Sequence, residues 1–354
     1  MSVFDVHRIW VNACGGDVGH SVRLELPWPR AGACGMVRRM ARFGAHLSVT
    51  EFRRAAAGRG AARREAETVT GPAAALERAI ELKCDCVQLF LRPNRQWDAR
   101  PYTEAMVRQF AEAASRPVRR GGEPLGPIVS HAAYLINIAG PAGDVARRSK
   151  HALIDELRRA DQLGVPYVVL HPGNHMGAGD EAGLHRVVET LDEVLPQFAE
   201  SPVELLLETT AGQGSAVGCR LEHLSWLIEH AALPGKLGVC ADTCHLFAAG
   251  YDLATAAGYA ATVEAIERTV GLARVKVWHL NDALRECGSR VDRHTHIGRG
   301  RIGREGFRRL VADARWADVP MILETPKEDA RGRPMDPVNL RLLRRLAGSA
   351  PTSA

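Results

Sequence analysis

Short apolar, β-prone runs alternate with longer segments of helical spacing along this chain, and that alternation constrains the fold more than any other feature. Eight such runs follow Arg42, and they are Phe43–Leu47, Cys86–Phe90, Pro127–Ser130, Tyr167–Leu170, Val203–Leu207, Leu237–Ala241, Val275–Trp278 and Pro320–Leu323. Strands that alternate with helices form parallel β-α-β units, so eight repeats predict an α/β fold, the (β/α)8 TIM barrel. A doubly wound open sheet is the alternative on pattern alone.

The segments between these runs carry apolar residues every three or four positions. Ala73–Leu82, Ala146–Leu163 and Gly183–Phe198 are examples. This spacing places the apolar side chains on one face of a helix, where they can cover a sheet. The chain of 354 residues exceeds the roughly 250 residues of a typical barrel, so it has room for additional segments.

Two regions fall outside the barrel pattern. Glycine and proline are frequent before the first run, where no period is visible, and a stretch rich in Arg, Ala and Glu follows that run. We hypothesise that translation starts naturally at Met36 or Met40. The predicted organisation is a poorly ordered extension over residues 1–40, a barrel domain over 41–347 with a polar insertion at about 50–70, and a frayed tail over 348–354.

Composition excludes several classes of protein. Apolar residues make up 46% and charged residues 25% of the chain, as in ordinary globular proteins, and no apolar run approaches the roughly 18 residues of a membrane span. The eight cysteines contain no C-x-x-C pair, which argues against a disulfide framework or a thiolate zinc site and favours a cytoplasmic protein with reduced thiols. The net charge of +5 permits a polyanionic partner without requiring one.

Imidazole and carboxylate side chains follow six of the predicted strands, where the loops of a barrel converge on its functional face. The nine candidates are His131, His171, Glu208, Asp242, His245, His279, Asp292, His294 and Glu324. Zinc takes these ligand types, and manganese or iron accepts similar ones. A single residue of this kind is more often a cap or a surface group, but nine together exceed the needs of one ion and predict two or three. Glu208, near the middle of the set, could bridge two ions.

Several longer motifs extend this interpretation. They are GAHLS (Gly44–Ser48), QLFLRPNRQW (Gln88–Trp97), SHAAYLINIA (Ser130–Ala139), LHPGNH (Leu170–His175), LETTAGQGS (Leu207–Ser215), DTCHLFAAGYD (Asp242–Asp252), HLND (His279–Asp282), GSRVDRHTHIGRGRIG (Gly288–Gly303) and LETP (Leu323–Pro326). With these motifs the chain resembles the endonuclease IV family of apurinic/apyrimidinic (AP) endonucleases from about Gly44 to Pro326. DTCHLFAAGYD and GSRVDRH are the most specific of them.

The resemblance implies a xylose-isomerase-like barrel with three Zn²⁺ per chain, for which Mn²⁺ or Fe²⁺ could substitute at some positions. It implies a DNA repair endonuclease that hydrolyses the phosphodiester 5′ to abasic sites, leaving a 3′-hydroxyl and a 5′-deoxyribose phosphate, with metal-bound hydroxide as the nucleophile. Glu208 would be the catalytic, bridging carboxylate. The implied ligand groups are His131, His171 and Glu208 for the first ion, Glu208, Asp242, His279 and Glu324 for the second, and His245, Asp292 and His294 for the third.

The same resemblance implies that the protein binds duplex DNA with an abasic site. It further implies a monomer that has no membrane partner. Arg95 and Gln96 would probe the gap left by the missing base, and Tyr134 would pack against the bent duplex. Trp97 is better interpreted as a core anchor than as a DNA contact. Basic loop residues should meet phosphates, and the candidates are Arg290, Arg293 and Arg299.

Four features depart from the family pattern. Thr209 stands where the family usually has asparagine, which could alter a hydrogen bond beside the metal ligands. Ser130 replaces the more usual residue before the first histidine. The insertion at about 50–70 interrupts a loop that lies near DNA in the family, and the extension over residues 1–40 has no counterpart.

Two alternative functions and one misleading motif compete with this interpretation. A metal-dependent sugar isomerase or epimerase of the related barrels would use similar ligands around one or two ions, and a basic barrel could bind DNA without cutting it. Asp292, His294 and His245, as a third ligand group, favour the nuclease. The G-x-G-x-x-G pattern at Gly298–Gly303 follows a loop rather than a strand, so it argues for a shaped loop and against a nucleotide cofactor.

Overall fold

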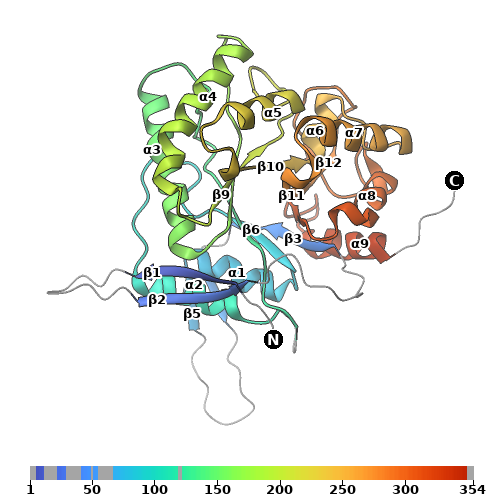
Figure 1. The fold of residues 1–354 in the computed structure, drawn as a ribbon. Helices are drawn as coiled ribbons and strands as arrows, with labels where there is room; N and C mark the ends of the chain where they lie inside the picture. The colour runs from blue at the N-terminus through green and yellow to red at the C-terminus, as the bar shows by residue number, and fades with distance from the viewer. Residues whose placement is uncertain are drawn as a thin grey trace.

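Eight parallel strands close into a barrel in the computed structural model, which describes residues 5–11, 22–28, 41–48, 51–54, 67–118 and 122–348 (Figure 1). Neighbouring strands follow one another in chain order, and the last pairs with the first. In that order they are β3 (Arg42–His46), β6 (Cys86–Leu89), β7 (Ile128–His131), β8 (Tyr167–Leu170), β9 (Glu204–Glu208), β10 (Leu237–Asp242), β11 (Val275–Leu280) and β14 (Pro320–Leu323). The predicted (β/α)8 barrel is confirmed, and the open-sheet alternative is wrong.

Helices pack around the outside of the barrel (Figure 1). They are α1 (Pro72–Glu81), α2 (Glu104–Ser115), α3 (Asp144–Leu163), α4 (Asp180–Val194), α5 (Leu221–His230), α6 (Thr243–Ala249), α7 (Ala256–Thr269), α8 (Gly303–Ala312) and α9 (Asp336–Gly348), with short 3₁₀ turns at Leu195–Phe198, Pro234–Lys236, Leu272–Arg274 and Ala314–Trp316. Within the described ranges, none of these helices has both the length and the apolar character of a membrane span.

Three short antiparallel pairs accompany the barrel. They are β1 (Asp5–Val11) with β2 (Val22–Trp28), β4 (Glu51–Arg54) with β5 (Glu67–Thr70), and β12 (Asp282–Ala283) with β13 (His294–Thr295). The second pair lies at the two ends of the predicted insertion, and the first is not predicted from the sequence. Met36, Met40, residues 55–66 of the insertion and residues 349–354 of the predicted tail lie outside the described residues.

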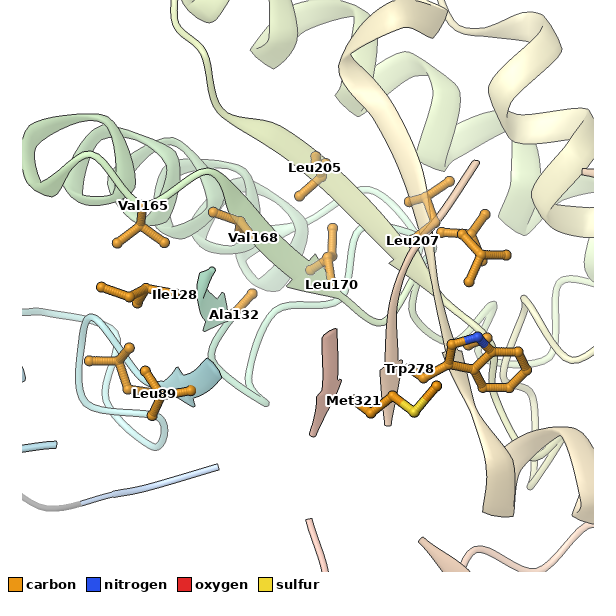
Figure 2. Close-up of a cluster of buried hydrophobic side chains, with 14 of the residues drawn as sticks. Leu89, Ile128, Ala132, Val165, Val168, Leu170, Leu205, Leu207, Trp278 and Met321 are labelled. Atoms are coloured by element: carbon orange, nitrogen blue, oxygen red, sulfur yellow. The ribbon is translucent and has the colours of Figure 1, made fainter. Parts of the chain in front are cut away.

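Outward-facing side chains of the strands pack beneath the helices. Figure 2 shows part of this layer, with Leu89, Val168 and Leu205 among buried side chains from successive strands. Trp278 of β11 contacts the ring of Trp316 edge-on, with the ring centroids 5.2 Å apart. Successive strand residues alternate between faces, so the intervening positions point into the barrel.

The inward-facing positions form a second, separate apolar cluster. It contains one residue from each of seven strands, namely Cys86, Val129, Val169, Leu206, Cys240, Val277 and Ile322. Gly44 of β3 takes the eighth place, where a Cβ would lie 2.1 Å from the carbonyl oxygen of Cys86. The first strand therefore needs glycine here, and the next inward position on each strand lies at the mouth of the barrel.

A buried carboxyl on α3 and a buried guanidinium each connect one loop at that mouth to this helix or to its surroundings. Glu156 accepts a hydrogen bond from the backbone N–H of Ala133, at 3.0 Å, in the loop after β7. Arg92, which follows β6, donates to the backbone carbonyls of Ala152 on α3, at 3.2 Å, and of Trp97. Burial raises the pKa of Glu156 to about 8, although the charge of Arg92 opposes this shift. The glutamate is therefore held in its protonated form at neutral pH.

We predict that Glu156→Gln makes the protein less sensitive to alkaline pH. Between the ordinary glutamate pKa of about 4.3 and pH 8, the folded protein keeps a proton that the unfolded chain has released, so the free energy of unfolding falls as pH rises. Glutamine keeps an acceptor for Ala133 but cannot ionise. The melting temperature of the parent should fall relative to the variant between pH 5 and pH 8.5. Glu112→Gln, an exposed change on α2, is the control. Parallel pH profiles for parent and variant would contradict the prediction.

Candidate metal centre

A ring of polar side chains occupies the inward position at the mouth of the barrel, two residues beyond the apolar layer on every strand. Its members are His46, Gln88, His131, His171, Glu208, Asp242, His279 and Glu324. Six of the eight are buried; His171 and Glu324 are partly exposed. Because inward positions recur every second residue, the parallel strands of the barrel gather these eight side chains at the same end of its interior.

Glu208 lies at the centre of this ring and is fully buried. Its Oε2 is 3.1 Å from Nε2 of His131 and 2.9 Å from Nε2 of His171. Its Oε1 is 3.0 Å from Nδ1 of His279 and 3.3 Å from Nδ1 of His245. The two oxygens of one carboxylate therefore face different sets of imidazoles, which is the arrangement a bridging ligand requires.

The structure brings all nine predicted ligands together at this mouth. Asp292 joins two of them from the loop after β11, with Oδ2 3.3 Å from Nε2 of His245 and Oδ1 3.1 Å from Nε2 of His294. Donor atoms lie within 4.8 Å of one another in four groups: His131, His171 and Glu208; Glu208, Asp242, His279 and Glu324; Asp242, His245 and His294; and Cys244, Asp292 and His294. The first two groups have the predicted membership, whereas Asp242 and Cys244 also lie near the third set.

Charge explains why a cation suits this pocket. Burial alone would raise the pKa of Glu208, but the facing imidazoles of His171, His279 and His131 hold it well below its usual range. His279 likewise holds the pKa of Glu324 at about 2 against the effect of burial. Burial would lower the pKa of His245, yet the carboxylate of Asp242 and its neighbours raise it well above its usual range. Glu208 and Glu324 are thus ionised at neutral pH, and the donor set fits divalent zinc in place of imidazole protons.

Backbone carbonyls orient two of the imidazoles. Nδ1 of His131 donates to the carbonyl of Ala132 at 2.8 Å, and Nδ1 of His245 donates to the carbonyl of Thr209 at 2.8 Å. When either ring is neutral, this leaves its Nε2 without a proton and available to a metal. The Thr209 hydroxyl also accepts from the backbone N–H of Asp242 at 2.9 Å. Thr209, which departs from the family pattern, therefore forms hydrogen bonds with two predicted ligand residues, Asp242 and His245.

Three polar residues beside the ligands were missed by the sequence analysis. His46 and Gln88 belong to the ring itself, and Asn281 donates to Oδ2 of Asp242 at 2.6 Å while accepting from the backbone N–H of Glu324 at 3.0 Å. His46 carried a usable signal, because it lies near the end of the first predicted strand. The two amides carried no such signal, because Gln and Asn are not among the usual ligands of zinc.

The predicted DNA contacts lie around the same mouth. The Tyr134 side chain is 60% exposed, and its ring centroid is 5.4 Å from that of Phe90 and 5.7 Å from that of His131. Arg95 and Gln96 are exposed in the loop after β6.

Trp97, next in the chain, is half-buried against the core, with the Arg148 guanidinium 5.3 Å from its ring centroid. That position fits a core anchor. The neighbouring Arg95 and Gln96 are left pointing to the surface by the same loop, where a ligand could reach them.

The arginines predicted to meet phosphates are also exposed, and they lie on the loop between β11 and α8. Arg290, Arg293 and Arg299 all belong to this loop. Asp282 holds its second half by accepting backbone N–H groups, including that of Gly300 at 2.9 Å. A Cβ on Gly300 would lie 2.5 Å from the carboxylate of Asp282, so this glycine of the G-x-G-x-x-G pattern shapes the loop.

Comparisons with known proteins agree on the fold. The family described as "Xylose isomerase-like TIM barrel" matches residues 76–346. A solved D-tagatose 3-epimerase-like protein is 20% identical, with a TM-score of 0.58, and the match covers 79% of this chain and 96% of that chain. At this identity the likeness concerns the fold alone.

More similar proteins share one name. The "Probable endonuclease 4" of Chloroflexus aurantiacus is 43% identical over 88% of this chain and 100% of its own length. The crystal structure of endonuclease IV from Thermus thermophilus is 36% identical, with a TM-score of 0.69, and the match covers 87% of this chain and all of that one. The chain therefore belongs to the endonuclease IV family.

Proposed function

We propose that this protein is a DNA repair endonuclease that hydrolyses the phosphodiester 5′ to abasic sites in duplex DNA, leaving a 3′-hydroxyl and a 5′-deoxyribose phosphate. Membership of the endonuclease IV family supports DNA cleavage. The observation that carries the proposal is the bridging geometry of Glu208, whose two oxygens face different ligand groups while a third group lies beside them. Cations held in these groups would concentrate positive charge at one place. Hydrolysis of a phosphodiester requires such charge, because the anionic diester repels nucleophiles and has a poor leaving group.

We propose three zinc ions in these groups, with manganese or iron as possible substitutes. The predicted sets would hold them: His131, His171 and Glu208; Glu208, Asp242, His279 and Glu324; and His245, Asp292 and His294. Bound zinc would supply a water of lowered pKa as nucleophile and would offset the charge of the phosphodiester and leaving oxygen. Glu208, the proposed catalytic residue, is fully buried. It would link the first and second ligand groups and orient the attacking water.

The rim residues would supply recognition. Tyr134 offers an exposed ring beside the first ligand group, so it could pack against a bent duplex. Arg95 and Gln96 extend from the neighbouring loop and would occupy the gap at the missing base. An abasic nucleotide leaves the stack at low cost, which favours lesions over intact DNA. Exposed loop arginines would contact phosphates and make affinity fall with salt.

A sugar isomerase or epimerase remains the alternative, since proteins with that chemistry share the fold. Such barrels would need one or two ions. The contacts of Asp292 with His245 and His294 form a further group and favour the nuclease. We also propose that the protein acts as a monomer in the cytoplasm, which agrees with free thiols at the six cysteines that the structure describes. One ion per chain in a metal analysis would favour the sugar enzyme.

We predict that the purified protein nicks duplex DNA 5′ to a tetrahydrofuran abasic analogue without added magnesium. Prolonged chelation should abolish cleavage and zinc should restore it, because the cation set completes the site. Gel analysis locates the nick, and extension by a DNA polymerase confirms a 3′-hydroxyl. Undamaged duplex is the control. Cleavage that survives complete metal removal would contradict the proposal.

We predict that Glu208→Gln lowers the single-turnover cleavage rate by several orders of magnitude while leaving lesion binding largely intact. The neutral amide keeps the volume of the side chain but loses the charge that faces two ligand groups. Rapid-quench kinetics and a binding titration separate the two effects. Glu264→Gln, an exposed change on α7, should cleave like the parent. Normal cleavage by Glu208→Gln would exclude a bridging role.

A further inference from the structure

Gln88 is the only amide in the ring at the mouth of the barrel, as far as the structure describes it, and it is fully buried. Its Nε2 donates to Oε1 of Glu324 at 2.6 Å and lies 2.9 Å from Nδ1 of His46. Its Oε1 lies 2.7 Å from Nε2 of His279. Both amide hydrogens and the carbonyl oxygen are thus engaged, and two of the three partners belong to the second ligand group.

Chemistry permits one orientation of this amide. With nitrogen and oxygen exchanged, the carbonyl oxygen of Gln88 would lie 2.6 Å from a carboxylate oxygen of Glu324, and two acceptors would face each other. Oxygen therefore faces His279. Because a carbonyl oxygen only accepts, Nε2 of His279 must carry a proton and donate it.

This hydrogen bond determines which nitrogen of His279 faces the ion. Nδ1 of the same ring lies 3.0 Å from Oε1 of Glu208, 3.2 Å from Oε2 of Glu324 and 3.8 Å from Oδ2 of Asp242. With Nε2 committed to Gln88, Nδ1 can offer its lone pair to the centre of those three carboxylates. His279 thus differs from His131 and His245, which reach their groups through Nε2.

A hydrogen bond with His46 also holds the amide of Gln88 in place. Nδ1 of His46 accepts from the amide of Gln88, so Nε2 of His46 carries the proton. This Nε2 lies 3.2 Å from the hydroxyl of Ser48. The orientation of the amide is therefore set by contacts on each side.

We infer that Gln88 is a positioning residue of the second ligand group: it selects Nδ1 of His279 as the metal-binding nitrogen and holds Glu324 toward the same ion. The inference rests on the proposed function insofar as that function requires a cation in this group. Gln88 itself supplies no ligand atom, since its oxygen and nitrogen are occupied by His279, Glu324 and His46.

Zinc affinity provides the first test. Gln88→Met preserves length and apolar volume but leaves Nε2 of His279 without its acceptor and Glu324 without its donor. Competition with a chromophoric chelator should show one zinc ion bound about 10- to 100-fold more weakly than in the parent, with the remaining ions unchanged. Gln197→Met, an exposed glutamine, is the control and should bind like the parent. Thermal unfolding of the metal-free proteins checks that the variant folds.

A second measurement needs no change at Gln88. Long-range ¹H–¹⁵N spectra of the zinc-loaded parent, labelled at histidine, report the tautomer of each ring, and His279→Asn identifies the signals by their loss. We expect protonated Nε2 and metal-bound Nδ1 for His279. Metal-bound Nε2 would overturn the inference even if Gln88→Met failed to fold.

The outcomes separate this inference from the proposed function. A parent that binds no zinc would overturn both. A parent that binds zinc, together with a folded Gln88→Met protein of equal affinity at every ion, would overturn the role of Gln88 alone. Selective weakening of one ion, with the expected tautomer in the parent, would establish the role.

Discussion

A fully buried carboxylate requires positive charge beside it, and this requirement organises the mouth of the barrel. Glu208 has no exposure to solvent, yet four imidazoles approach its two oxygens within 3.3 Å. Asp242 is equally buried, and Asn281 and Thr209 bond to its side chain and backbone. Protons or metal ions must balance this charge, since leaving an ionised carboxylate unpaired in the interior costs several kcal/mol. The folding of the barrel and the binding of cations are therefore linked.

The period of two in a β-strand converts this requirement into geometry. One inward layer is apolar and closes the barrel, and the next is polar on every strand. Loops then complete the site. The backbone N–H of Asn174 donates to Oδ1 of Asn137 at 2.9 Å, and the backbone N–H of His175 donates to the carbonyl of Ser215 at 2.9 Å. The loops after β7, β8 and β9, which begin beside His131, His171 and Glu208, are thereby joined to one another.

The sequence predicts much of this arrangement because local signals were strong. Two of the eight strands, Tyr167–Leu170 and Pro320–Leu323, have the predicted bounds, and the others differ by one or two residues at one or both ends. The ligand types could be found because parallel strands gather their ends at one face. The strand pair Asp5–Val11 and Val22–Trp28 was not predicted, since its pairing joins residues whose pattern alone has no visible period.

The remaining features depend on three-dimensional proximity that spacing cannot reveal. Gln88 and Glu324 are separated by 236 positions, so neither hints at the other in the sequence. The choice between Nδ1 and Nε2 in each histidine depends on the partner of the second nitrogen, which only coordinates supply. Likewise, the contacts of the Thr209 hydroxyl with the backbone of Asp242 and of the Thr209 carbonyl with His245 join residues that are 33 and 36 positions apart, so spacing alone does not predict them.

We propose above all that bound cations share Glu208 at the mouth of the barrel. Anomalous X-ray diffraction from crystals of the zinc-loaded protein, recorded on both sides of the zinc absorption edge, tests this proposal most directly. We expect three peaks within the mouth of the barrel, two of them on opposite oxygens of Glu208 and the third beside Asp292. A single peak, or peaks away from Glu208, would contradict the shared site on which the proposed chemistry depends.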